Sequence, residues 1–419
     1  MPSRTLTSTA IFTLAKSVGP LALALFLAVG AWGGTFNVLY NFTGGTDGGI
    51  PLGGLIADEH GNLYGTTAYG GTYGAGVVFK LDRHGKESVL YTFTGGADGG
   101  SPQDSLLRDQ DGNLYGTTAG GGSYGAGVVF KLDSSGNETV LHTFTNGADG
   151  GTPIAGLIAD DAGNLYGTAS TGGNGGQSCP FGPSGCGLVF QIDTSGNENV
   201  LYTFTGGADG SSPYGGLLRD EAGNLYGTTT DGGDLVDPNC ITYGCGTVFK
   251  LDPSNNETVL YAFTGGADGL VPQGTLVQDA SGILYGTTPA GGYEGGSCPN
   301  GSGGCGVVFE LNLQEQQSVL HTFNAGTDGW QPFAGVVLDK NGNIYGTTFG
   351  GGGSLCGGDG CGIVFKLGRH EKETILHSFS GTDGAENSFG SLLIEHGSLY
   401  GTAAAGGSYG AGVIFELPQ

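Results

Sequence analysis

Short apolar runs separated by polar turns rich in Gly and Asp recur along the chain after residue 35. In one unit the runs cover 105–109, 113–118, 128–132 and 139–144. Asp-x-x-Gly turns join the first two runs at 109–112 and the last two at 133–136, in the residue order that type I turns favour. No run has an apolar period of 3.6 residues, so the pattern predicts almost no helix and four short antiparallel strands per unit.

The unit occurs seven times, and each copy carries a Leu/Ile-Tyr-Gly-Thr motif in its second strand. The motif recurs every 51 to 60 residues, a spacing that is typical of propeller blades and too long for one coil of a β-solenoid. Blades are packed on both faces by their neighbours, so we expect the motif tyrosines to be core residues. They are Tyr64, Tyr115, Tyr166, Tyr226, Tyr285, Tyr345 and Tyr400.

The two ends of the repeat region complete one blade between them. Segment 36–43 has the pattern of a fourth strand with no earlier partners, whereas 391–394, 398–402 and 413–418 read as first, second and third strands with no fourth. Pairing of 36–43 with 413–418 would close a ring and remove two exposed sheet edges. The sequence therefore predicts an all-β, seven-bladed β-propeller that forms a single domain over 31–419.

Residues 1–30 have the pattern of a secretory signal peptide. Arg4 and Lys16 precede or flank an apolar run at 18–29, and Ala28 and Gly30 supply small residues at the positions that signal peptidase recognises. An uncleaved anchor is the alternative, but the run is short for a span of about 20 residues. We expect cleavage after Gly30, a secreted or periplasmic protein, and no membrane span in the mature chain.

The chain is strongly acidic, with a net charge of −25 at pH 7. Such a charge repels nucleic acid and anionic membrane surfaces, which excludes both as partners. It leaves room for cationic partners, although solubility outside the cell explains it without any partner. Glycine accounts for 91 of 419 residues, and only its regular period argues against a low-complexity chain.

Eight cysteines form four local pairs, each in the loop between the second and third strands, which we name the hairpin loop. The pairs occur in copies three to six, where this loop is longer than in the other copies. They are Cys179 and Cys186, Cys240 and Cys245, Cys298 and Cys305, and Cys356 and Cys361. Zinc would need four ligands, and each loop offers two thiols without a histidine. We therefore expect four disulfides, each contributing roughly 2–3 kcal/mol by constraining the unfolded chain.

Three segments carry a family resemblance: Asn-Leu-Tyr-Gly-Thr-Thr at 113–118, Val-Val-Phe-Lys-Leu-Asp at 128–133 and Val-Leu-Tyr-Thr-Phe-Thr-Gly-Gly-Ala-Asp-Gly at 89–99. They resemble the GloVer tandem repeat of exported bacterial proteins, and the resemblance covers 36–419. It implies bacterial export and a repeat architecture, but no established activity and no catalytic residues. The C-terminal anchoring signal common in that family is not visible, so we expect free release.

One Asp-Gly pair occurs in each loop from a fourth strand to the next blade, which we name the connecting loop. The aspartate is expected to accept local backbone hydrogen bonds while glycine takes a positive φ. Calcium binding by one carboxylate per blade is the alternative, although calcium prefers six to eight oxygens. The residues are Asp47, Asp98, Asp149, Asp209, Asp268, Asp328 and Asp383.

Hairpin and connecting loops are expected on one rim of the ring, and residues there that break the repeat are candidate ligand contacts. Exposed aromatic rings near carboxylates suit sugar binding, whereas packing within their own loops is the alternative. The aromatic candidates are Trp330, Tyr69, Tyr73, Tyr124, Tyr293, Phe349 and Tyr409. Acidic neighbours are Asp231, Asp234, Asp237 and Glu294, and Asp104 replaces a small residue close to the ring axis.

No catalytic residue is identified. Two Gly-x-Ser-x-Gly segments, 121–125 and 406–410, lack the helix that a nucleophile elbow requires. His142, His321 and His377 replace a tyrosine of the fourth strand. We expect a monomeric, non-enzymatic extracellular binding or adhesion module for a glycan, a cell-surface polymer or a surface protein, with no cofactor except calcium. The alternatives are a propeller lyase, glycosidase or lactonase acting at the channel mouth, and a structural surface or matrix protein.

Overall fold

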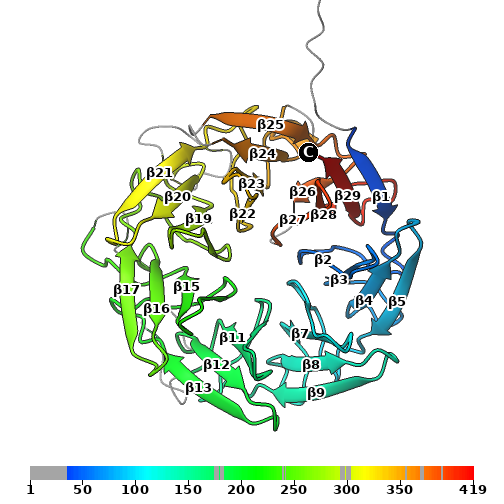
Figure 1. Cartoon of the computed structure of the whole chain (residues 1–419), viewed down its shortest axis with the longest axis horizontal. Coiled ribbons are helices and arrows are strands. Elements are labelled where there is room, and N and C mark those ends of the chain that lie inside the picture. Colours follow the sequence, from blue (N-terminus) through cyan, green and yellow to red (C-terminus); the bar gives the residue numbers. More distant parts are fainter. Residues whose placement is uncertain are drawn as a thin grey trace, which may run out of the picture. The chain divides into compact units, whose positions relative to one another are not determined.

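The computed structural model describes residues 35–173, 184–237, 242–292, 303–353, 356–368, 372–387 and 390–419, together with Cys179, Cys240 and Cys298. The expected signal peptide, 1–30, lies outside the described residues. Seven antiparallel sheets form a ring (Figure 1), which confirms the predicted seven-bladed propeller. Within the described residues η1 (Cys356–Gly358) is the one helical turn, and no helix is long and apolar enough to span a membrane.

Blades 1 to 6 each contain four strands, ordered from the ring centre to its perimeter (Figure 1). Blade 1 comprises β2 (Ile56–Ala57), β3 (Leu63–Thr67), β4 (Val77–Leu81) and β5 (Glu87–Thr92). Blade 2 comprises β6 (Leu107–Arg108), β7 (Leu114–Thr118), β8 (Val128–Leu132) and β9 (Glu138–Thr143). Blade 3 comprises β10 (Ile158–Ala159), β11 (Leu165–Ala169), β12 (Leu188–Ile192) and β13 (Glu198–Thr203).

The next three blades follow the same plan. Blade 4 comprises β14 (Leu218–Arg219), β15 (Leu225–Thr229), β16 (Thr247–Leu251) and β17 (Glu257–Ala262). Blade 5 comprises β18 (Val277–Gln278), β19 (Leu284–Thr288), β20 (Val307–Leu311) and β21 (Gln317–Thr322). Blade 6 comprises β22 (Val337–Leu338), β23 (Ile344–Thr347), β24 (Ile363–Leu367) and β25 (Glu373–Ser378).

Blade 7 is assembled from both ends of the repeat region, as the sequence predicts. It contains β26 (Ala385–Asn387), β27 (Leu393–Glu395), β28 (Ser398–Ala405), β29 (Val413–Pro418) and β1 (Asn37–Asn41). The outermost strand, β1, pairs antiparallel with β29, with Asn37 opposite Glu416 and Asn41 opposite Val413. This pairing closes the ring, because the strand edge of β29 that the chain would otherwise leave exposed is covered by β1.

The same pair of phenylalanines joins adjacent blades at every junction. A buried phenylalanine after each fourth strand packs edge-on against a third-strand phenylalanine of the next blade, with ring centroids 5.1 to 5.3 Å apart. The pairs are Phe42–Phe79, Phe93–Phe130, Phe144–Phe190, Phe204–Phe249, Phe263–Phe309, Phe323–Phe365 and Phe379–Phe415. Each such pair adds about 0.5–1.5 kcal/mol beyond its buried area. A Cβ at Gly65 would lie 2.7 Å from the Phe79 ring, so the motif position before threonine has no room for a side chain.

The repeated tyrosines are buried or half-buried, and their hydroxyls donate to a turn aspartate in blades 1 to 6 and to Glu416 of β29 in blade 7. In blade 1 the Tyr64 hydroxyl donates to Asp58 Oδ2 at 3.0 Å, while Asp58 Oδ1 accepts the amides of His60 and Asn62. Lys80 lies over the Tyr64 ring, 5.4 Å from its centroid. Burial opposes ionisation of Asp58, but the hydrogen bonds from Asn62, Tyr64 and His60 outweigh it and lower its pKa to about 2.

All four predicted disulfides are present. They join Cys179 to Cys186, Cys240 to Cys245, Cys298 to Cys305 and Cys356 to Cys361. Each closes a hairpin loop of blades 3 to 6, and no thiol remains for metal binding. Disulfides of this kind persist in oxidising compartments.

Candidate functional site

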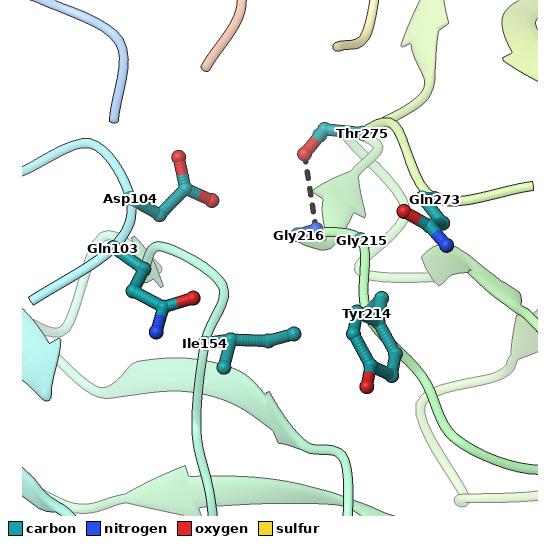
Figure 2. Close-up of a pocket in the computed structure, with 8 residues that line it drawn as sticks. All are labelled: Gln103, Asp104, Ile154, Tyr214, Gly215, Gly216, Gln273 and Thr275. Carbon is teal, nitrogen blue, oxygen red and sulfur yellow. Dashed lines mark hydrogen bonds between the residues drawn. The ribbon is translucent and has the colours of Figure 1, made fainter. Parts of the chain in front are cut away.

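The connecting loops reach the ring axis with a residue that varies from blade to blade. It follows the repeat's proline and is Leu52, Gln103, Ile154, Tyr214, Gln273 and Phe333 in blades 1 to 6. Gln103, Ile154, Tyr214 and Gln273 line a cavity of about 90 Å³ together with Asp104 and Thr275 (Figure 2). This volume is below the roughly 300–1,000 Å³ of small-molecule sites, so the cavity can take a single small group rather than a whole ligand.

Asp104 lies at this cavity, close to the channel where the sequence placed it. Its Oδ2 accepts the Gly156 amide of the neighbouring connecting loop at 2.7 Å, and its Oδ1 accepts the Ser105 amide at 2.6 Å. Burial raises the pKa of Asp104, and these hydrogen bonds oppose that rise. Asp104 therefore ties two connecting loops together, and its contact with a ligand stays a prediction.

Small residues at the axis let neighbouring connecting loops touch. The Gly390 amide donates to the Leu52 carbonyl at 2.8 Å, and a Cβ at Gly390 would lie 1.8 Å from the Gly54 nitrogen. The Gly216 amide donates to Thr275 Oγ1 at 3.0 Å, as Figure 2 shows. Neighbouring connecting loops at the axis are therefore hydrogen-bonded to one another.

Three tyrosines occupy one position of the hairpin loop in blades 7, 1 and 2, which are consecutive in the ring (Figure 1). We call Tyr409, Tyr73 and Tyr124 the tyrosine row; they are 66%, 64% and 68% exposed. Tyr69 of blade 1 is 55% exposed as well. These four side chains present their rings to solvent on the loop rim, as expected from the sequence.

Other aromatic candidates differ in placement. Trp330 is 3% exposed, and its indole N–H donates to the Asp359 carbonyl at 3.0 Å. Phe349 is half-buried and packs edge-on against Trp330, with centroids 5.8 Å apart. The expectation that Trp330 is an exposed rim residue is therefore wrong, because the indole fills the space inside its own loops. Tyr293, like Glu294, lies outside the described residues.

A second, polar cavity lies between the disulfide-closed hairpin loops of blades 3 and 4. Its lining includes Asp231, Ser212, Thr171, Ser184 and Tyr243. Burial raises the pKa of Asp231, against hydrogen bonds from Ser212 and Thr230 that lower it. Tyr243 is 56% exposed.

Another acidic rim candidate, Asp234, accepts hydrogen bonds from backbone amides of its own turn, one of them the amide of Asp237. Asp234 Oδ1 accepts the Val236 amide at 2.8 Å and the Asp237 amide at 3.3 Å. Among the described members of this acidic group, Asp231 lines the polar cavity.

The connecting-loop aspartates accept hydrogen bonds from residues that precede them closely in the chain. Asp47 Oδ2 accepts the Thr43 amide at 2.8 Å and the Tyr40 hydroxyl at 2.9 Å, and Oδ1 accepts the Thr43 hydroxyl. Burial raises the pKa of Asp47, but these hydrogen bonds lower it by more. Similar local bonds hold Asp98, Asp149, Asp209, Asp268, Asp328 and Asp383. Calcium binding by these residues stays a prediction.

A glutamate from the next blade faces the connecting-loop aspartate at several junctions. Burial, followed by repulsion from Asp47, raises the pKa of Glu87 to about 7. Glu138 beside Asp98 and Glu257 beside Asp209 have the same raised pKa of about 7, with burial again the larger cause. In blade 5 the corresponding residue is Gln317, whose amide donates to the Asp268 carbonyl at 3.3 Å.

The axial residues Tyr214 and Gln273 and the polar cavity with Tyr243 were not among the candidates from sequence. Tyr214 is 43% exposed, and its pKa is raised by burial and then by Asp231. A signal was present, because the residue after the repeat's proline varies while its neighbours stay small. No comparable signal marked Tyr243, which lies inside an insertion without a repeat equivalent.

Solved structures of other propellers share this fold at low sequence identity. An extracellular domain from B. thetaiotaomicron is 10% identical with a TM-score of 0.55, covering 90% of this chain and 39% of the other. A puromycin-hydrolysing peptidase of Mycobacterium tuberculosis is 11% identical with a TM-score of 0.51, covering 88% of this chain and 52% of the other. A puromycin hydrolase in complex with PGG is 12% identical with a TM-score of 0.52, covering 85% of this chain and 50% of the other. This chain thus spans about half or less of those proteins, and the likeness concerns the fold.

No curated protein matches this sequence. The Gloeobacter/Verrucomicrobia repeat matches it in three stretches, 28–235, 180–298 and 295–419. Together these stretches include every blade and both strands that close the ring. The resemblance seen in the repeated motifs is confirmed, and the chain belongs to the Gloeobacter/Verrucomicrobia repeat family.

Proposed function

We propose that this protein is an extracellular, non-enzymatic binding module that holds a neutral glycan on its loop rim. The tyrosine row carries the proposal: three rings at one repeat position of consecutive blades, each 64% to 68% exposed. Exposed aromatic rings leave apolar surface in contact with water, and these tyrosines do not bury that surface within the protein. Sugar rings stack well on such aromatic surfaces. Equivalent positions in a ring of blades suit an extended, repeating polymer better than a compact ligand.

The chemistry of the cavities supports recognition rather than reaction. The axial cavity offers two amides, one hydroxyl, one phenol and one carboxylate, namely Gln103, Gln273, Thr275, Tyr214 and Asp104. Such groups can donate to and accept hydrogen bonds from sugar hydroxyls. Glycosidases of the common types use two carboxylates flanking the scissile bond, and the lining of this cavity supplies one.

An oxidising, extracellular setting fits the same proposal. Four disulfides brace the hairpin loops of blades 3 to 6, and the acidic charge favours solubility. Export would require the 1–30 leader, whose cleavage after Gly30 is part of this proposal.

A binding screen of residues 31–419 against bacterial and plant polysaccharides, with and without calcium, tests the proposal. Each ring of the tyrosine row should contribute about 1 kcal/mol, so Tyr73→Ala should weaken binding about fivefold and Tyr73→Phe should preserve it. Tyr243→Ala, on a blade away from the tyrosine row, is the matched control and should bind normally. Absence of saturable binding, or equal loss in both alanine variants, would rule out the tyrosine row as the site.

One observation favours the rival class, an enzyme acting at the channel mouth. Asp104 is the acidic residue of the axial cavity, and burial raises its pKa, as is common for general acids. Its two backbone hydrogen-bond donors give it a structural role already. Turnover of a bound glycan that disappears in Asp104→Asn while binding persists would establish the enzyme instead.

A further inference from the structure

The junction between blades 5 and 6 brings together a histidine and two carboxylates from three different segments. His321 belongs to β21, Asp328 to the connecting loop and Glu373 to the start of β25 in the next blade. One nitrogen of His321 and one oxygen from each carboxylate lie within 4.8 Å of one another. Among the described residues no other group of three such side chains comes this close.

We propose that His321, Asp328 and Glu373 form a binding site for a divalent transition-metal ion, with Zn²⁺ as the best match. Zn²⁺ accepts imidazole nitrogen and carboxylate oxygen together, at about 2.0–2.2 Å, in a tetrahedral shell. Donors at those distances are about 3.4 Å apart, so small side-chain rotations would complete the shell. Water would supply the fourth ligand, because His321 and Asp328 keep 16% and 22% of their side-chain surface exposed.

Two departures from the repeat create this arrangement. At the junction of blades 7 and 1 the corresponding residues are Tyr40 and Thr43, whose hydroxyls bond to the two oxygens of Asp47. Here His321 stands in place of that tyrosine and Asn324 in place of that threonine.

Asn324 directs hydrogen bonds to one oxygen of Asp328, and its side-chain amide also donates to the Thr322 carbonyl at 3.0 Å. Asn324 donates its backbone amide to Asp328 Oδ2 at 2.7 Å and its side-chain amide to the same oxygen at 3.4 Å. Asp328 Oδ1 therefore faces His321 Nε2 at 3.2 Å. His321 therefore supplies a potential metal ligand in place of a hydroxyl donor, and Asn324 leaves Asp328 Oδ1 without the threonine hydroxyl that bonds to it at other junctions.

Solvent access to the ligand atoms points the same way. His321 Nε2 and Glu373 Oε1 are shielded from water without a hydrogen bond of good geometry, as are His142 Nε2 and Glu198 Oε1 at the blade 2–3 junction. Polar atoms in such places are normally satisfied. A metal ion at the common centre of His321 and Glu373 would satisfy both and would link blade 5 to blade 6.

Two related junctions serve as internal comparisons. At His142 the threonine is retained, and the Thr145 hydroxyl occupies Asp149 Oδ1, with His142 Nε2 3.5 Å from Oδ2. At His377 no glutamate is present, because Phe36 stacks on the imidazole with centroids 3.6 Å apart. We therefore place the metal at the blade 5–6 junction and at neither of the other two.

Zn²⁺ titration of the untagged, metal-free protein at pH 7.5 by calorimetry tests the site, with Co²⁺ absorption as a readout of coordination. The wild type should bind one tight equivalent that also raises the melting temperature. His321→Tyr, Asn324→Thr and Glu373→Gln should each lose that equivalent, while retaining the fold because each restores a residue used at another junction. His377→Tyr should keep it, and excess Ca²⁺ should not compete.

Absence of a tight equivalent in the wild type would overturn the proposal. So would an unchanged equivalent in His321→Tyr together with Glu373→Gln. Displacement of Zn²⁺ by Ca²⁺ would also overturn it, because that result would assign an oxygen-only site. Melting temperatures without metal identify any variant that has failed to fold.

Discussion

Replacing the junction glutamates Glu87, Glu138 and Glu257 by glutamine should remove a large part of the pH dependence of stability near neutrality. Each glutamate has an Oε1 shielded from water without a hydrogen-bond partner. Each also has a pKa raised to about 7, first by burial and then by an aspartate of the preceding blade. Gln317 shows that a neutral amide fits at this position.

The charged groups around each glutamate are few. Asp47 acts on Glu87, and the Tyr40 phenol adjoins the same pair. Asp98 with Tyr91 and Asp209 with Tyr202 repeat the arrangement at Glu138 and Glu257. Because the phenols stay neutral near pH 7, titration of the glutamates dominates locally.

The magnitude follows from the pKa change. A rise from 4.5 to about 7 corresponds to about 3 kcal/mol per glutamate if it acted in full. These side chains are only half-buried, so solvent screening reduces the figure to about 1 kcal/mol each. Three glutamates together should contribute about 3 kcal/mol, or roughly 3–6 °C in melting temperature for a domain of this size.

The sign is set by proton binding. A pKa raised in the folded state means that the folded protein binds more protons, so stability falls as pH rises. The contribution is fully present below the unfolded pKa of 4.5 and is lost as pH rises through about 7. Wild type should therefore be more stable at pH 5 than at pH 8.

Thermal melts at pH 5 and pH 8, confirmed by urea unfolding, measure the difference for both proteins. The triple glutamine variant should lose about 3 kcal/mol of the pH 5 to pH 8 change and should be more stable than wild type at pH 8. Equal pH dependence in the two proteins, or wild-type stability that rises between these pH values, would refute the reasoning.

Three further predictions concern the axis and the rim. Asp104→Ala should cost about 1–3 kcal/mol in urea unfolding because the Gly156 amide loses its acceptor, whereas Asp104→Asn should cost less. Gly390→Ala places a Cβ 1.8 Å from the Gly54 nitrogen, so the forced backbone shift should lower stability by about 1–3 kcal/mol, measured by thermal unfolding. Cys240→Ser should cost about 2 kcal/mol by removing a small closed ring from the unfolded chain; an unchanged urea midpoint would contradict this.

The scaffold was predictable because its determinants are local and repeated. The pairing of 36–43 with 413–418 follows from an incomplete first blade and an incomplete last blade, and β1 pairs with β29 as expected. Disulfides such as Cys240–Cys245 follow from cysteines a few residues apart within one insertion. Each of these inferences needed only the order of residues along the chain.

Contacts between blades were not predictable in the same way. Glu87 meets Asp47 across a junction, 40 positions apart in the sequence, and neither residue is unusual in its own segment. Trp330 was expected on the surface because it breaks the repeat, but the neighbouring insertion supplies the Asp359 carbonyl and buries the indole. Insertions such as the one that carries Asp359 determine whether a residue that departs from the repeat is buried. The other blades contain no equivalent of these insertions, so their path could not be inferred from the repeat.

A residue that departs from the repeat therefore indicates a binding site only when its side chain is not accounted for by packing in its own surroundings. Trp330 and Tyr214 both replace smaller residues in connecting loops, yet Trp330 is 3% exposed and Tyr214 is 43% exposed. Burial of the Trp330 ring removes its apolar surface from water and so stabilises the fold. The exposed part of Tyr214 makes no such contribution to stability, and it faces the axial cavity. The same reasoning separates His321, whose hydroxyl-bearing neighbour has been replaced by Asn324, from His142, whose carboxylate partner remains bonded to Thr145. In a ring of near-identical blades, binding sites are best sought where a blade differs and its own packing does not account for the difference.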